Sequence, residues 1–264
     1  MPRFAANLTM MFTEWPFLDR FAAAREAGFD AVEFLFPYDH APHEVGDRLH
    51  AQGLTQALFN LPPGDWPAGE RGYAAFPDRF DELQRDVERA LAYVEATGVT
   101  RVHLMAGLAS RHDPAAAAAY ARAVAWAADR LAREGVDLVL EPINRRDMPG
   151  YFLDDFAFAE ALIADLARPN LKLQFDIYHR QILQGDVTMA LRRLMPIIGH
   201  VQVASVPARH EPTTGELADG FLFAELDRLG YDGFVGCEYR PLTGTLEGLG
   251  WFAPYRATTE AGAA

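Results

Sequence analysis

The sequence contains one cysteine, Cys237, and one lysine, Lys172, among its 264 residues. A single cysteine excludes an intrachain disulfide and any paired-cysteine pattern for structural zinc or redox chemistry. It also favours a reducing cytoplasm as the location of the protein. A single lysine leaves one candidate for Schiff-base chemistry.

Long apolar runs and an excess of positive charge are also missing. No continuous apolar segment is long enough to span a bilayer, and the N-terminus lacks the pattern of a secretion signal. Acidic residues outnumber basic ones by 37 to 24, for a formal net charge of −13. Such a surface repels nucleic acid and anionic membranes. We therefore expect no nucleic-acid or membrane partner, and an anionic substrate would need a local basic pocket.

Short apolar segments alternate eight times with segments of helical periodicity, which predicts βαβ units and a parallel sheet. The predicted strands are Arg3–Phe12, Ala31–Phe36, Thr55–Leu61, Arg101–Gly107, Asp137–Asn144, Leu171–His179, His200–Ser205 and Phe234–Arg240. The clearest predicted helices are Pro16–Gly28, Asp78–Thr97, Pro114–Arg133, Asp154–Ala167 and Phe221–Leu229. Glycines stand where several of these helices should end.

Eight such units at this length predict one α/β domain over residues 1–264, a (β/α)₈ TIM barrel whose last few residues form a flexible tail. The alternative is an open doubly wound sheet. Its G-x-G-x-x-G fingerprint is missing after the first strand, as is a Walker-type phosphate loop. The helix-poor connection Leu61–Pro77 follows the third strand and is predicted to be an active-site loop or lid.

Four predicted strands carry a polar side chain near their end, within an apolar segment. VLEPIN contains Glu141, LQFDIYH contains Asp176, HVQVAS contains Gln202 and VGCEYRP contains Glu238. The intervals are 35, 26 and 36 residues, about one βα unit each. Active sites of such barrels lie at the C-terminal strand ends, so the four side chains should meet there.

Strand parity supports the same conclusion, because successive side chains point to opposite faces. The residue before each of the four is apolar and suited to face the helices: Leu140, Phe175, Val201 and Cys237. Any one acid alone could be a solvated strand-end residue, but the four together favour a shared site. Three converging carboxylates repel unless protons or a cation neutralise them. Carboxylates with an amide carbonyl match Mg²⁺ or Mn²⁺.

The segments EPIN, FDIYHRQ, GHVQVASVPARHEPTTGE and GCEYRP resemble the hydroxypyruvate isomerase family, within the xylose-isomerase-like barrels. The likeness runs almost end to end, and 2-oxo-tetronate isomerase is a close sibling. It implies that Glu141 and Glu238 are the catalytic acid–base groups. It also implies that both touch a divalent-metal position completed by Asp176 and Gln202. The wider superfamily often has histidine at the strand-7 position, so the neutral Gln202 weakens the case for an obligatory metal.

Five further residues are candidates for substrate binding. His179 follows Asp176 by three residues, and the resemblance places substrate contact there; the alternative is a half-exposed loop histidine. Arg209 and His210, after strand 7, could bind a substrate carboxylate or be ordinary surface charges. His103 and Asn60 are polar interruptions near strand ends, and either could instead be a core polar group.

Other polar residues have more structural interpretations. Glu33 in the second strand is expected to make structural hydrogen bonds, and Cys237 should point outward and be inert. Arg145 and Arg146, directly after EPIN, are second choices for anion binding. Lys172 begins a predicted strand, away from the catalytic end, so Schiff-base aldolase chemistry is disfavoured.

The predicted function is isomerisation of hydroxypyruvate and tartronate semialdehyde, the substrate pair of the resembling family. Two carboxyl groups with tuned pKa values can move a proton between neighbouring carbons through a cis-enediol. The alternatives are 2-oxo-tetronate isomerase or a sugar 3-epimerase with the same acids. An endonuclease IV-like enzyme would need a richer histidine cluster for three zinc ions and a basic groove. A catalytically silent binding barrel and a homodimer also stay open.

Overall fold

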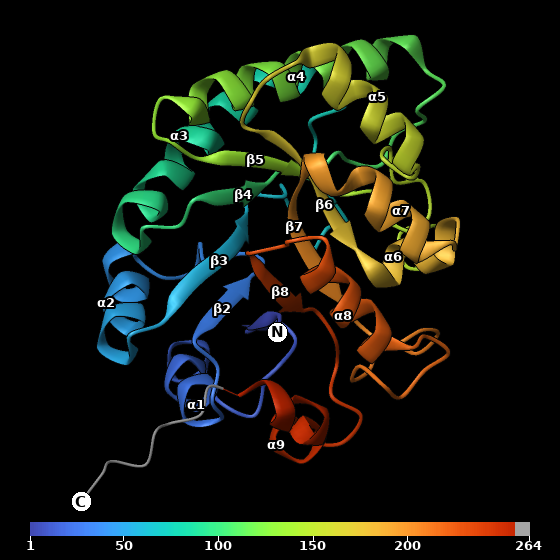
Figure 1. Ribbon diagram of the computed structural model, residues 1–264. Coiled ribbons are helices and arrows are strands. Elements are labelled where there is room, and N and C mark those ends of the chain that lie inside the picture. The colour runs from blue at the N-terminus through green and yellow to red at the C-terminus, as the bar shows by residue number, and fades with distance from the viewer. Residues whose placement is uncertain (257–264) are drawn as a thin grey trace, which may run out of the picture.

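The computed structural model describes residues 1–256, in which eight parallel strands close into a barrel in the order β1 to β8. Figure 1 shows the barrel with the helices packed around it. The strands are β1 (Arg3–Asn7), β2 (Ala31–Phe34), β3 (Thr55–Asn60), β4 (Arg101–His103), β5 (Asp137–Leu140), β6 (Leu171–Asp176), β7 (Ile198–Val203) and β8 (Phe234–Cys237). The predicted TIM barrel is confirmed, whereas the predicted flexible tail falls on residues 257–264, outside the described residues.

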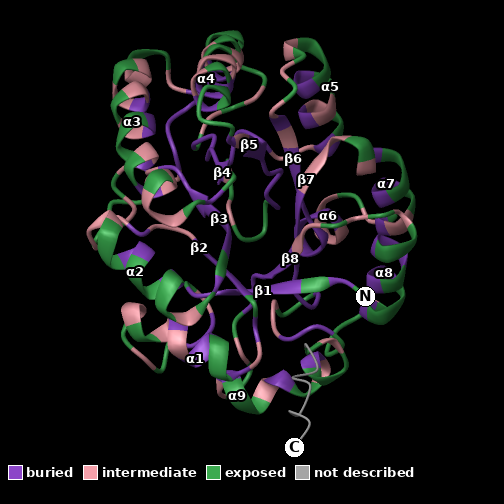
Figure 2. Ribbon diagram, turned by 60° about the vertical axis from the view of Figure 1, so that its left-hand side comes forward, coloured by how far each residue is buried: buried purple, intermediate pink, exposed green. Residues whose placement is uncertain are grey.

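Helices follow the strands and cover the outside of the barrel, with their exposed faces turned to solvent (Figure 2). They are α1 (Arg20–Glu26), α2 (Pro42–Gln52), α3 (Phe80–Thr97), α4 (Pro114–Ala132), α5 (Phe156–Leu166), α6 (Ile177–Leu183), α7 (Val187–Leu194), α8 (Asp219–Arg228) and α9 (Thr245–Gly248). Within residues 1–256, 3₁₀ helices lie at Phe17–Asp19, Pro77–Arg79, Met195–Ile197 and Leu249–Tyr255. Among residues 1–256, no helix is both long and apolar enough to cross a membrane.

Seven of the eight strands are shorter than their apolar patterns predict, whereas β7 has the predicted length but begins and ends two residues earlier. The strand predicted over Arg101–Gly107 ends at His103, because the chain then leaves the barrel wall and Ala106 pairs with Gly72 in a loop. Leu104 and Met105 are nevertheless buried in that loop. A hydrophobic pattern indicates which residues are buried, not which residues pair in a sheet. Buried residues in the loops after the strands therefore extend the apolar pattern beyond the strand ends.

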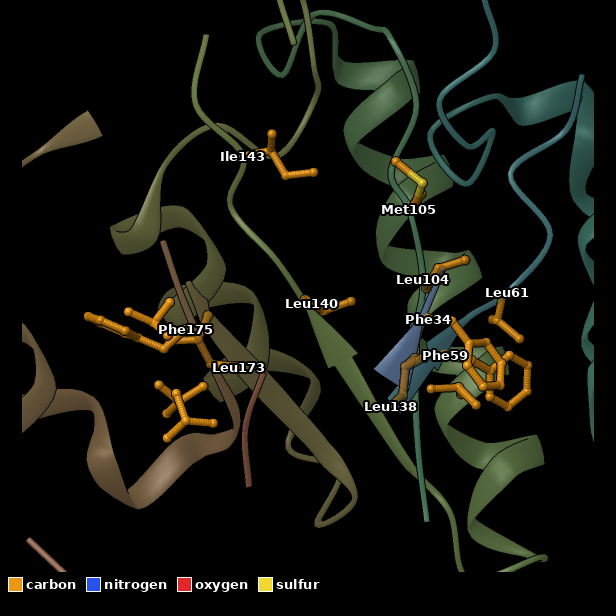
Figure 3. Close-up of a cluster of buried hydrophobic side chains, with 14 of the residues drawn as sticks. Phe34, Phe59, Leu61, Leu104, Met105, Leu138, Leu140, Ile143, Leu173 and Phe175 are labelled. Atoms are coloured by element: carbon orange, nitrogen blue, oxygen red, sulfur yellow. The ribbon is translucent and has the colours of Figure 1, made fainter. Parts of the chain in front are cut away.

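The main hydrophobic core lies between the barrel wall and the helices. Figure 3 shows part of it, with Phe34, Leu140 and Phe175 among large apolar side chains contributed by several strands. Leu140, Phe175, Val201 and Cys237 are all fully buried in this core. The predicted parity is therefore confirmed, and the polar residue after each of them points into the barrel.

The inside of the barrel is filled by small apolar side chains and by a buried polar network instead of large apolar side chains. Small side chains of Ala5, Ala31 and Ala57 form a separate cluster there. Above them, the buried Glu33 carboxylate accepts hydrogen bonds from Asn7 at 2.9 Å and from Gln202 at 2.8 Å, and it contacts His200 Nε2 at 2.6 Å. Glu33 thus has the structural hydrogen-bonding role predicted for it.

The Glu33 carboxylate occupies space that a side chain at position 236 would need. A Cβ atom at Gly236 would collide with both carboxylate oxygens of Glu33. We expect Gly236→Ala to lower the free energy of unfolding by about 2 kcal/mol, measured by urea denaturation, because overpacking must displace a buried, hydrogen-bonded acid. Gly220→Ala on α8 is the matched control, since nothing lies within 4 Å of its Cβ position. Equal stability of the two variants would contradict this account.

Candidate active site

A cavity of about 440 Å³ opens among the loops that follow the strands. Its lining includes Asn60, His103, Glu141, His179, Arg209 and Glu238. Six residues that lie on or after six different strands are therefore brought to one place. Their position matches the C-terminal face at which barrels of this kind carry their active sites.

Three buried carboxyl groups form the centre of this site. Glu141 and Glu238 directly follow β5 and β8, and Asp176 ends β6. Each is at most 4 % exposed. Together with His179 they offer one ligand atom each, all within 4.8 Å of one another. So dense a set of buried acids must be neutralised by protons, by a basic side chain or by a cation.

The two carboxylate oxygens of Asp176 have different roles. Oδ1 accepts hydrogen bonds from the backbone N–H groups of Tyr178 at 2.6 Å and His179 at 3.2 Å, which caps α6. Oδ2 is buried without a hydrogen-bond partner among residues 1–256 and lies 3.7 Å from His179 Nε2. Capping therefore fixes the carboxylate so that its second oxygen faces the cluster.

The surroundings of His179 determine its tautomer. The backbone N–H of Asn144 donates to His179 Nδ1 at 3.3 Å, and the Asn144 side-chain nitrogen lies 2.7 Å from the same atom. A backbone N–H can only donate, so Nδ1 is the acceptor and Nε2 carries the proton; Arg209 Nη2, also a donor, lies farther away, 3.5 Å from Nε2. Burial and the nearby Arg209 charge hold the pKa of His179 well below its usual range. His179 is thus a neutral donor, better suited to a substrate oxygen than to a metal.

Arg209 supplies positive charge inside the cluster. Its Nη2 donates to Glu238 Oε2 at 2.5 Å and lies 3.9 Å from Asp176 Oδ2, while its Nη1 lies 3.5 Å from Asp147 Oδ2. The Arg209 side chain is only 15 % exposed. It is therefore an internal counter-ion for the acids rather than an ordinary surface charge.

The pKa values of the two glutamates are displaced upward. Burial and the neighbouring carboxyl groups of Glu238 and Asp176 raise the pKa of Glu141 well above its usual range. Burial raises the pKa of Glu238 to about 8, although the Arg209 charge opposes the rise. Carboxyl groups tuned in this direction can exchange protons near neutral pH.

Gln202 is held by other side chains. Its Nε2 donates to Glu33, and its Oε1 accepts a hydrogen bond of 2.6 Å from Gln174 Nε2. Because the Glu33 carboxylate can only accept, the Gln202 amide must turn its carbonyl away from Glu33. The carbonyl predicted as a metal ligand is thus oriented by Glu33 and already shared with Gln174.

The remaining predicted binding residues separate into two groups. His103 and Asn60 are buried and line the cavity, and neither ring nitrogen of His103 has a hydrogen-bond partner within residues 1–256. Burial lowers the pKa of His103 to about 3, so its ring is neutral. His210 is not brought to the cavity, because its Nδ1 lies 2.8 Å from the backbone carbonyl of Arg240.

Comparison with known proteins identifies the family of this barrel. The family described as xylose isomerase-like TIM barrel matches residues 21–255. The chain belongs to this family. The 2-oxo-tetronate isomerase of Cupriavidus necator is 55% identical over 257 residues, which cover 97% of this chain and 99% of that protein. The hydroxypyruvate isomerase of Escherichia coli is 42% identical over 258 residues, 97% of this chain and 100% of that protein.

A solved structure is similarly close. The crystal structure described as AP endonuclease, family 2, from Brucella melitensis superposes with a TM-score of 0.95 at 48% identity, covering 97% of this chain and all of that chain. A D-allulose 3-epimerase from Methylomonas sp. shares the fold, with a TM-score of 0.75 at 18% identity. The relatives from C. necator and E. coli are named isomerases, so the resemblance predicted from the sequence motifs is confirmed.

The residues of this family member fit a divalent cation. Glu141 Oε1 and Asp176 Oδ2 are buried oxygens without hydrogen-bond partners in the described part of the chain. Together with Glu238 they form a set of hard oxygen donors, which suits an ion such as Mg²⁺ or Mn²⁺. The cluster can therefore bind a metal, in line with the predicted cofactor.

Sequence reasoning missed residues that support the site. Asn144 fixes the tautomer of His179, and Asp147 contacts Arg209. Both lie in the EPINRRD segment, where a polar run directly after a strand was a signal that could have found them. Gln174, two residues before Asp176 on the same face of β6, should likewise have been read as pointing inward.

Proposed function

We propose that this protein is an aldose–ketose type isomerase that interconverts hydroxypyruvate and tartronate semialdehyde. The observation that carries the proposal is the pair of buried glutamates, Glu141 and Glu238, which line one cavity and whose pKa values are both raised, that of Glu238 to about 8. The names of the full-length relatives support the same class of reaction.

The reaction needs one proton removed and one delivered. A base takes a proton from C3 of hydroxypyruvate, the C2 carbonyl oxygen gains a proton, and a cis-enediol forms. Return of a proton to C2, with loss of the C3 hydroxyl proton, gives tartronate semialdehyde. We assign the two transfers at carbon to Glu141 and Glu238, which come from β5 and β8 and so approach the cavity from different sides of the barrel.

The oxygens of the enediol need hydrogen-bond donors. We propose that the Nε2–H of His179 serves one of them, with His103, Asn60 and Arg209 as further contacts. His210 would act indirectly, by holding the loop after β7 against Arg240.

We propose Mg²⁺ or Mn²⁺ as the cofactor, held by Glu141, Asp176 and Glu238. When bound, such an ion would stabilise the negative charge that develops on the two vicinal oxygens. Glu33 holds the Gln202 amide so that the carbonyl of Gln202 faces away from Glu33. This carbonyl could join the metal ligands only by giving up its hydrogen bond with Gln174.

Deuterium exchange tests the proposal directly. In deuterium oxide, hydroxypyruvate should gain carbon-bound deuterium at C3 and yield tartronate semialdehyde deuterated at C2, followed by NMR with and without Mg²⁺ or Mn²⁺. Exchange should be fastest with the true substrate. Absence of exchange with every short hydroxy-oxo acid would refute the isomerase.

One sibling substrate is favoured by a specific observation. The C. necator relative, 55% identical, is named 2-oxo-tetronate isomerase. The same two glutamates could shift the carbonyl of this four-carbon acid, and the cavity of about 440 Å³ has room for it. Running 2-oxo-tetronate beside hydroxypyruvate in the exchange assay compares their kcat/KM values.

The description of the Brucella structure raises nuclease activity as a second candidate. We propose that this chain does not act on nucleic acid, because its net charge is −13 and the acidic cluster within residues 1–256 includes one histidine, His179. Binding of abasic DNA at low salt would contradict this proposal. We further propose a cytoplasmic location, which rests on the single buried cysteine; a homodimer stays an expectation.

A further inference from the structure

The proposed substrate carries a carboxylate that the acid cluster would repel. Three buried carboxyl groups occupy one side of the cavity, so the substrate carboxylate needs a cation elsewhere. Four arginines line the cavity: Arg71, Arg146, Arg209 and Arg240. The Arg209 guanidinium already donates hydrogen bonds to the carboxylates of Glu238 and Asp147. The other three have no carboxylate partner among residues 1–256.

Of these three, Arg71 has a fixed guanidinium. The group stacks on Trp66, with 3.8 Å between Arg71 Cζ and the ring centroid. Its Nη1 donates to the backbone carbonyls of Trp66 at 3.1 Å and Glu70 at 2.7 Å. Nε and Nη2, the edge that can bind a carboxylate through two hydrogen bonds, make no side-chain or backbone hydrogen bond in the described residues.

The loop that carries Arg71 is itself anchored. The backbone of Gly72 donates to Pro63 and pairs with Ala106. A side chain at Gly72 would collide with the Met105 carbonyl, and its φ of 91° is in the left-handed region. The close packing of Gly72 holds the neighbouring Arg71 in place before substrate binds. Less conformational entropy is then lost when the substrate binds.

Topology places the loop of Arg71 opposite two of the three acids, Asp176 and Glu238. This loop follows β3, and in the closed order β1 to β8 the strand opposite β3 is β7. Asp176 and Glu238 come from β6 and β8, the two neighbours of β7. A carboxylate bound at Arg71 would therefore direct the carbonyl end of the substrate toward the acid cluster.

The other two arginines lack these features. Arg146 and Arg240 are exposed, and no contact within residues 1–256 fixes either guanidinium. We infer that Arg71, held by Trp66, binds the carboxylate of the substrate and makes the site selective for 2-oxo acids. The inference rests on the proposed function and adds to it a specificity-determining residue.

Variants at Arg71 test this inference. Arg71→Ala should raise KM for hydroxypyruvate about 10- to 100-fold with kcat changed much less, because a charge-assisted bond to the unreacting end contributes to ground and transition states alike. Arg71→Lys should recover only part of the loss, since lysine keeps the charge but not the fork. Arg168→Ala, whose guanidinium pairs with Asp129 outside the cavity, is the matched control.

Binding of glycerate, an unreactive analogue with the same carboxylate, separates this inference from the proposed function. Calorimetry should show weaker glycerate binding to Arg71→Ala by a similar factor, whether or not the protein isomerises hydroxypyruvate. An unchanged glycerate affinity, or a loss that appears in Arg146→Ala or Arg240→Ala instead, would overturn the assignment. A fall in both kcat and melting temperature in Arg71→Ala would also overturn the assignment, because it would indicate a structural role for Arg71.

Discussion

Replacing Glu141 or Glu238 by glutamine is expected to lower kcat/KM for hydroxypyruvate by about 10²- to 10⁴-fold, the range for loss of a general acid or base. Glutamine keeps the shape of the side chain but cannot carry the proton. Glu141 is buried among like charges, so Glu141→Gln should leave the free energy of unfolding unchanged or higher, whereas Glu238→Gln also breaks the ion pair with Arg209 and should lower it. Steady-state kinetics and thermal melting measure the two effects.

Glu225→Gln provides the comparison for this pair of variants. Glu225 is as buried as the two glutamates, but it lies on α8 and pairs with Arg192 and Arg228 outside the barrel. Its turnover should match the wild-type value. If Glu141→Gln and Glu238→Gln also retained full turnover, the acid–base assignment would be wrong. If the wild type bound hydroxypyruvate without turnover and both variants kept that affinity, the barrel would be a binding protein.

Replacing Arg209 by methionine is expected to destabilise the fold by about 3 kcal/mol at pH 8, because it leaves buried carboxylates without their counter-ion. Burial already raises the pKa of Glu238 to about 8 against the effect of Arg209, and loss of the guanidinium should raise it further. A carboxyl group with a raised pKa in the folded state binds its proton more tightly there than in the unfolded chain. The stability deficit should therefore grow as the pH rises above 8, where wild-type Glu238 loses its proton and the variant keeps it, and should change little below pH 8.

The same variant should respond more strongly to metal. With Arg209 absent, Mg²⁺ or Mn²⁺ becomes the available positive charge, and its binding to the folded state should raise the melting temperature more than it does in the wild type. Arg145→Met, at an exposed ion pair with Asp154, should change neither quantity. Stability equal to the wild type at pH 8 would show that Arg209 does not balance the acid cluster.

The amino-acid sequence predicts much of this architecture, because buried and inward-facing residues alternate regularly along the strands. Strand parity placed Leu140, Phe175, Val201 and Cys237 outward, and all four are in the core. The same pattern overextended the strands, since Leu104 and Met105 are buried in a loop rather than in β4. Alternation records which side chains avoid water, but strand ends depend on pairing with a neighbour.

Within the site, sequence reasoning placed Glu141, Asp176 and Glu238 together, because their spacing follows from the repeat of the fold. It could not separate the neighbours Arg209 and His210, one of which reaches the acids while the other contacts a backbone carbonyl. That difference depends on the path of a loop with no repeat to constrain it.

The sequence alone determined the barrel, the hydrophobic core between the strands and the helices, and the convergence of Glu141, Asp176 and Glu238. These features follow from local periodicity that is repeated eight times. The tertiary structure decided the proton position on His179, the orientation of Gln202 by Glu33, and the fixed guanidinium of Arg71. Each of these depends on hydrogen bonds or stacking that either join segments distant in the chain or require the exact path of a loop. No pattern along the chain encodes such contacts, because they exist only after the barrel has closed.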